Sequence, residues 1–208
     1  MLIERGPELL LLLALIAVSA SGVACSKNFV EPETAAKTST LEGPGAGTSA
    51  PRAGAQRVHF KAPAGWVEQQ PSSSMRKAQY LLPQAEGDPE DAELVVYHFP
   101  GQGGSISSNL SRWVGQMSRP DGSPASDDAQ VSERQVRGKA ITLLDVGGTY
   151  RGMMGPRAQG KAKPGFRMLG AIVDTRDGPW FFKLTGPAAT VAKWSVSWDK
   201  FVESFQVY

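Results

Sequence analysis

The sequence contains very little of the two residue types that hold most structural metals. Its 208 residues include one cysteine, Cys25, and two histidines, His59 and His98. A single cysteine cannot form an intrachain disulfide, and three Cys/His residues fall short of the four ligands of a structural zinc site. We therefore exclude a disulfide framework and a zinc-dependent fold, and we expect no metal or other cofactor.

The chain also lacks a strong charge of either sign and the common catalytic motifs. Its formal net charge is +2, which is too weak a bias to indicate nucleic acid as a partner. It contains no G-x-S-x-G, Walker A or H-E-x-x-H motif. We therefore predict a protein that is not an enzyme. Two alternatives stay open: an enzyme whose site is assembled from scattered residues, and a carrier of a small ligand.

The longest apolar run, Leu9 to Val18, is too short to span a bilayer as a helix. It is typical of the central region of a signal peptide. Small residues lead from it to Cys25, a pattern that resembles the lipobox of bacterial lipoproteins. The resemblance implies cleavage before Cys25 and a diacylglycerol on its sulfur, whereas cleavage after Ala20 or Gly22 would leave a free thiol. We predict a signal segment over 1–24, export, and a membrane anchor through the lipid.

Residues 25–56 are rich in alanine, glycine, proline, serine and threonine. Such a segment buries too little apolar surface to offset the entropy of ordering it, so we expect a disordered tether. The tether would hold the rest of the chain away from a membrane. Ser26 is not acidic, which by resemblance to Gram-negative lipoproteins favours the outer membrane over the inner one.

Residues 57–208 show the periodicities of a single α+β domain. Two segments predict amphipathic helices: 106–117, with Ser105 as N-cap, and a C-terminal helix from Gly186-Pro187 onward, with Thr185 as N-cap. Short turns near Arg137-Gly138 and Thr175–Gly178 favour a largely antiparallel sheet covered by the two helices. The predicted strands are 58–61, 75–82, 93–99, 130–136, 140–150, 166–174 and 180–185.

The C-terminal stretch reads WFFKLTGPAATVAKWSVSWDKFVESF. It resembles the Mog1/PsbP-like fold, in which a strand ending in a Lys-x-Thr-Gly-Pro-like turn leads into a long terminal helix. The stretch PGQGGSISSNLSRWVGQM is similar to a group of secreted bacterial lipoproteins. The resemblance implies an α/β/α sandwich and a binding or assembly module of the cell envelope, with an envelope protein or component as partner.

Two polar features are candidates for partner binding. The first is Asn109, Arg112 and Gln116, which we expect on the outward face of the helix beside the glycine-rich turn 101–104. The second is the loop 152–165, predicted to be a long basic hairpin loop, with Arg157, Lys161 and Lys163 as its candidate residues. A loop without a function explains the second feature equally well, and the glycine-rich turn is either a simple connection or a cradle for an anion.

Overall fold

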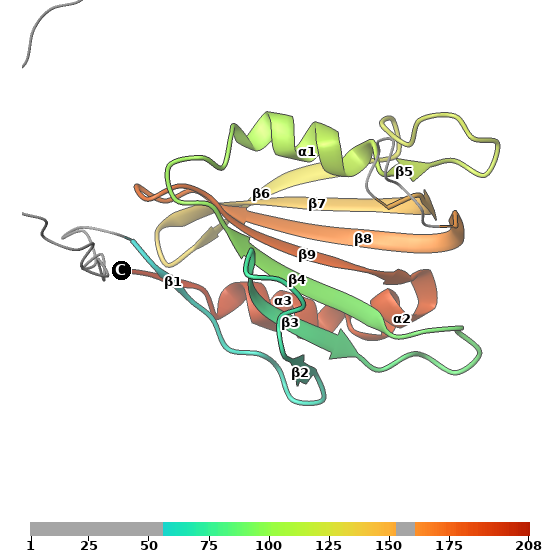
Figure 1. Cartoon of the computed structure of the whole chain (residues 1–208), viewed down its shortest axis with the longest axis horizontal. Helices are drawn as coiled ribbons and strands as arrows, with labels where there is room; N and C mark the ends of the chain where they lie inside the picture. Colours follow the sequence, from blue (N-terminus) through green and yellow to red (C-terminus); the bar gives the residue numbers. More distant parts are fainter. Residues whose placement is uncertain (1–55, 153–160) are drawn as a thin grey trace, which may run out of the picture. The chain divides into compact units, whose positions relative to one another are not determined.

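The computed structural model describes residues 56–152 and 161–208, and they form an antiparallel sheet with helices on both faces (Figure 1). Within these ranges no helix is long and apolar enough to cross a bilayer. The α+β class predicted from the sequence is confirmed. The elements are β1 (Val58–His59), β2 (Val67–Gln69), β3 (Arg76–Leu82), β4 (Ala92–His98), α1 (Ile106–Val114), β5 (Met117–Ser118), β6 (Gln130–Val136), β7 (Lys139–Tyr150), β8 (Lys163–Val173), β9 (Trp180–Pro187), α2 (Ala188–Lys193), α3 (Ser195–Glu203) and β10 (Gln206–Val207).

The main sheet has the strand order β2-β3-β4-β9-β8-β7-β5, and β6 pairs with the part of β7 that β5 leaves free. Both predicted turns join antiparallel neighbours. Arg137 (φ 50°) and Gly138 (φ 76°) both adopt positive φ in the two-residue turn between β6 and β7, which matches the twist of the flanking strands. Thr175 Oγ1 donates to the carbonyl of Gly178 (2.6 Å) in the turn before β9.

One face of the sheet is covered by α2 and α3, and we call it the α2/α3 face. Its core is dominated by aromatic rings: Phe182 stacks on Phe205 at 4.3 Å and meets Phe201 edge-on at 5.7 Å. Trp198 and Leu184 are buried in the same apolar core. Burying these large side chains supplies most of the drive that holds the C-terminal helices on the sheet.

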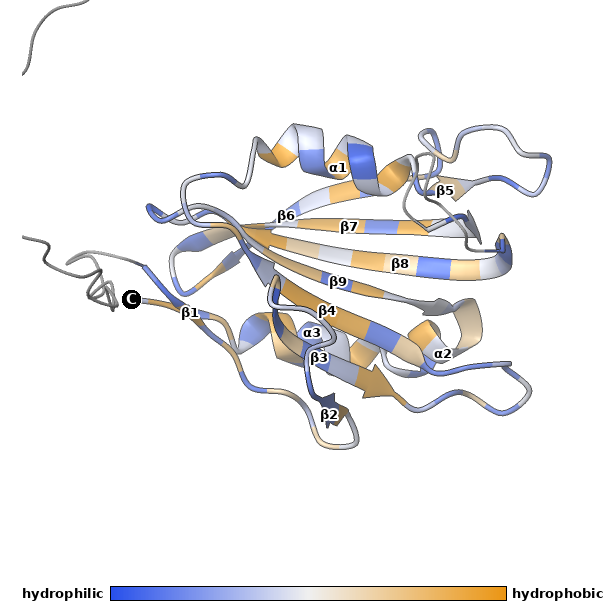
Figure 2. Ribbon diagram, in the orientation of Figure 1, coloured by the Kyte–Doolittle hydropathy of each residue, from blue (hydrophilic) through white to orange (hydrophobic). Residues whose placement is uncertain are grey.

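The opposite face carries α1, and we call it the α1 face. Trp113 packs against Phe181 and lies directly over Gly170 of β8, where a Cβ atom would come within 2.6 Å of the indole. Gly170 therefore admits the helix close to the strand. The α1 core lies over β7, β8 and β9 and the end of β4. Figure 2 shows α1 as a mixture of apolar and polar residues.

The predicted helix 106–117 is shorter in the structure, and its polar side chains point differently. Ser105 is the N-cap, as predicted, and accepts a hydrogen bond from the amide of Ser108 at 3.1 Å. The helix ends at Val114, and Met117 belongs to β5. The prediction that Asn109 and Gln116 face outward is wrong, since their exposed fractions are 5% and 6%. Of the three candidate residues, only Arg112 is exposed.

The predicted single C-terminal helix is two helices, and Thr185 is not its N-cap. Pairing with β8 extends β9 to Pro187, so Thr185 lies inside a strand. Pro187 has no side chain that could cap α2. The carboxylate of Asp88, in the loop between β3 and β4, takes that role by accepting from the amide of Thr190 at 2.7 Å. The chain leaves helical geometry at Trp194, and α3 begins at Ser195.

Three short strands were not predicted. Strands β2 and β5 extend the edges of the main sheet, and β10 pairs with β1 in a separate two-stranded sheet. The pairing of Val58 with Val207 joins the first and last strands of the domain. It also places His59 and His98 in different sheets. Short strands of this kind lack the alternation that makes a strand visible in sequence.

Candidate functional site

Polar side chains gather on the α1 face where the helix leaves the sheet uncovered. Within the described ranges, α1 packs over β7, β8, β9 and the end of β4, and α2 and α3 lie on the other face, so no helix covers the α1 side of β3 and of the rest of β4. Side chains from four strands and from the end of α1 meet there. We call this set the polar cluster; it consists of Arg76, Glu93, Tyr97, Arg112, Gln116, Tyr150 and Lys183.

Glu93 on β4 is the carboxylate of the cluster. Its Oε1 atom accepts from Arg76 Nη1 at 2.9 Å and from Gln79 Nε2 at 2.7 Å. Both donors come from β3, the strand beside β4. A β-bulge between Arg76 and Ala78 brings Arg76 opposite Tyr97, and bulges are a common device for re-aiming a side chain.

The three candidate residues predicted from the sequence, Asn109, Arg112 and Gln116, connect α1 to this surface. Asn109 Nδ2 donates to the carbonyls of Gly103 (2.7 Å) and Ser105 (2.8 Å), and its Oδ1 accepts from Arg112 Nη2 at 2.5 Å. Gln116 Oε1 accepts a hydrogen bond from Lys183 Nζ on β9. Asn109 thus stabilises the glycine-rich turn while orienting Arg112, and Gln116 holds Lys183.

Lys183 is the functional candidate that sequence reasoning missed. It is half-buried, and its Nζ lies 5.3 Å from the centre of the Tyr150 ring. Burial lowers the pKa of Lys183 to about 8; the Arg112 guanidinium acts in the same direction and the Glu93 carboxylate opposes it. The sequence feature that could have indicated it is a lysine between two large apolar residues, Phe182 and Leu184, in a predicted strand. A lysine in such a position is expected to be partly buried, which lowers its pKa.

Two tyrosines supply hydroxyl groups to the cluster. Burial raises the pKa of Tyr97, the charges of Arg76 and Arg112 lower it, and that of Glu93 raises it. Burial also raises the pKa of Tyr150, with the nearby Tyr97 and Glu93 adding to the effect. Both hydroxyls therefore stay protonated at neutral pH and can donate hydrogen bonds. The cluster offers ammonium, guanidinium and phenol donors from separate elements, and such convergence is typical of ligand sites.

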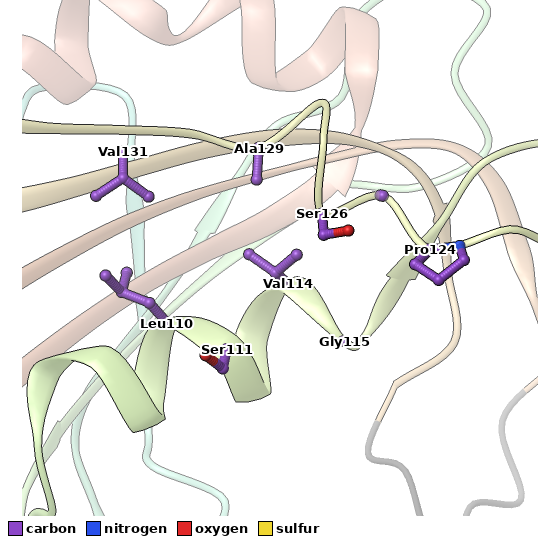
Figure 3. A pocket seen from close by; sticks show the side chains of 9 residues that line it. Leu110, Ser111, Val114, Gly115, Pro124, Ser126, Ala129 and Val131 are labelled. Atoms are coloured by element: carbon purple, nitrogen blue, oxygen red, sulfur yellow. The ribbon is translucent and has the colours of Figure 1, made fainter.

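A second concave region lies between α1, the segment before β6 and the start of β6. Figure 3 shows Leu110 and Val114 of the helix facing Val131 and Ala129, with Pro124 at one end of the depression. The depression measures about 380 Å³. Its polar side chains are only two serines, Ser111 and Ser126, so it offers apolar contact and no titratable group.

The candidates in the basic loop lie at or beyond its described edge. Lys163 begins β8, and its Nζ forms an ion pair with Glu90 at 2.6 Å. Lys161 is exposed. Arg157 lies outside the described residues, as does the lipidation candidate Cys25. The structure thus brings Arg112 and Gln116 together with Lys183, whereas Lys163 forms its ion pair with Glu90.

Among the described residues, no group of three or more histidine, cysteine or carboxylate side chains has the arrangement of a metal site. His98 is instead stacked on Trp180, with ring centres 4.5 Å apart. Its Nε2 lies 3.9 Å from the nearest Asp177 carboxylate oxygen and has no hydrogen-bond partner. Burial lowers the pKa of His98, although Asp177 acts in the opposite direction.

No protein-family model and no curated protein sequence matches the chain. Solved structures that align with it include the cyanobacterial PsbP (CyanoP) of Synechocystis, at 14% identity and a TM-score of 0.41, covering 77% of this chain and 98% of that one. They also include LpqN of Mycobacterium tuberculosis, described as involved in cell envelope biogenesis, at 11% identity and a TM-score of 0.44, covering 74% and 85%. PsbP belongs to the group that the C-terminal sequence resembles.

Proposed function

We propose that this chain is an exported, lipid-anchored binding module of the cell envelope, and that the uncovered part of the α1 face is its binding surface. The observation that carries the binding role is the polar cluster. Seven side chains from four strands and the end of α1 converge on a sheet surface that no described helix covers. Export and anchoring are supported by the apolar segment Leu9 to Val18 and by the small residues that lead to Cys25.

The binding surface can be tested by site-specific photo-crosslinking in a Gram-negative host. A photoreactive phenylalanine would replace Leu81, which lies on the same side of the sheet as Glu93, its partner in the register. The matched control carries it at Val196, which is 65% exposed and belongs to α3, on the other face. We expect adducts of defined mass from Leu81 and none from Val196. Equal adducts from both positions, or none from either, would contradict the proposal.

The anchor is tested separately by intact mass and fractionation of the expressed chain, with Cys25→Ala as the comparison. Loss of residues 1–24, a mass increase from acyl chains and membrane association that depends on Cys25 are the expected results. A soluble product without acyl chains would contradict the anchor but leave the binding surface to be judged by the cross-links.

A further inference from the structure

Arg112 and Lys183 are two cations held near each other with only neutral partners. Arg112 donates to the amide oxygen of Asn109, and Lys183 donates to the amide oxygen of Gln116. Neither forms an ion pair with a carboxylate in the described part of the chain. Burial and the charge of Arg112 both oppose protonation of Lys183. A charged pair in this setting lowers the stability of the fold.

The one carboxylate of the cluster already accepts two hydrogen bonds from β3. Glu93 accepts from Arg76 and from Gln79 through the same oxygen. When Lys183 is protonated, the cluster contains three cations (Arg76, Arg112 and Lys183) and this single anion, which gives it a net charge of +2. An excess of positive charge on a partly desolvated surface attracts an anion more strongly than the same charges in open solvent.

The neutral groups around the two cations are also suited to an anion. The hydroxyls of Tyr97 and Tyr150 remain protonated because burial raises the pKa of both. Lys183 Nζ stands over the Tyr150 ring. A carboxylate or phosphate oxygen accepts hydrogen bonds from ammonium, guanidinium and phenol groups alike, and bonds with an ionised partner are the stronger ones.

Building on the proposed binding surface, we propose that the polar cluster binds an oxyanion, a carboxylate or phosphate group, between Arg112 and Lys183. The oxyanion supplies the missing negative charge. Tyr97, whose pKa responds to Arg112, and Tyr150, whose ring faces Lys183 Nζ, would contribute further donors. By linkage, a bound oxyanion also raises the pKa of Lys183, because it favours the charged amine.

The test is a titration of the full-length chain, purified in detergent, with lysine side chains labelled for NMR. Inorganic phosphate and citrate are the two probes, and chloride at the same ionic strength is the control. We expect one or both probes to raise the pKa of Lys183 by about one unit, whereas chloride leaves it near its starting value. A response to citrate alone would identify a carboxylate ligand, and a response to phosphate alone would identify a phosphate.

Variants test whether the response arises at the cluster. Arg112→Gln, at an exposed position, should weaken binding of the active probe by about tenfold or more. Lys200→Gln removes an exposed cation from α3 on the other face and should leave the affinity unchanged. A folded chain whose Lys183 pKa responds equally to chloride, phosphate and citrate would overturn the oxyanion site. Cross-links from Leu81 in such a chain would leave the proposed binding surface intact.

Discussion

The two faces of the sheet differ in what lies on them. The α2/α3 face is closed by large rings, with Phe182, Phe201 and Phe205 almost completely buried. The α1 face is covered by a helix over part of its width and carries charged and phenolic side chains over the rest. Because burial of apolar surface drives folding, the α2/α3 face, which has the larger of the two buried cores, contributes more to stability. The α1 face tolerates a costly arrangement of like charges, which is expected where a surface serves a ligand.

The largest effect on stability should come from removing an aromatic ring from the core of the α2/α3 face. Phe182→Ala removes a ring that contacts Phe60, Phe201 and Phe205. We expect the free energy of unfolding to fall by about 3–5 kcal/mol, as for other buried aromatic residues. Denaturant unfolding followed by tryptophan fluorescence measures it. Val196→Ala, at an exposed position of α3, is the control and should change stability by less than about 0.5 kcal/mol. Similar losses in the two variants would contradict the assignment of the core.

The polar cluster on the α1 face should make the free energy of unfolding depend on pH. The unfolded chain keeps the lysine proton up to the usual pKa of 10.5, whereas folded Lys183 releases it near 8. Between these values the unfolded state binds more protons, so the stability of the fold rises with pH. Between pH 7 and 9.5 the contribution of Lys183 to this rise should amount to about 2 kcal/mol.

Lys183→Met separates this rise from other titrations. The variant keeps a long apolar stem but has no titratable amine, so the rise should be lost. Unfolding free energies of the two chains at several pH values are the measurement. Parallel curves for the two chains would contradict the lowered pKa. Added oxyanion should flatten the curve of the unmodified chain, because it raises the pKa of Lys183 back toward its usual value.

A smaller effect is expected at the loop that caps α2. Asp88 accepts hydrogen bonds from the amide and the hydroxyl of Thr190, at 2.7 and 2.5 Å. Asp88→Ala removes both, and we expect a loss of about 1 kcal/mol, typical of a lost N-cap. Glu86→Ala, at an exposed position of the same loop, should change little. Thermal unfolding of both variants decides the point, and equal melting temperatures would contradict the capping role.

Sequence reasoning predicted what depends on local pattern. The main strands, the Ser105 cap and the Arg137-Gly138 turn each follow from a few neighbouring residues. It could not assign the Asp88 cap, because the two partners lie 102 residues apart in the chain. It also misplaced Asn109 and Gln116, because helix periodicity identifies the apolar stripe but not what covers the polar side. Lys183 gained its significance only when folding placed Arg112 and Gln116 beside it.

The smallest effect on stability should arise at His98, on the α2/α3 face. Its ring is buried against Trp180, and burial lowers its pKa below 6.5. Folded His98 therefore resists protonation, while the unfolded chain accepts the proton, so stability falls as pH drops below about 6.5. Asp177, 3.9 Å away, reduces the loss, and the exposed Lys77 adds to it. His98→Phe keeps the stacked ring without the titration, so its stability should fall less between pH 7 and 5. If both chains lost stability equally over that range, carboxylates elsewhere would account for the acid sensitivity, and His98 would contribute nothing to it.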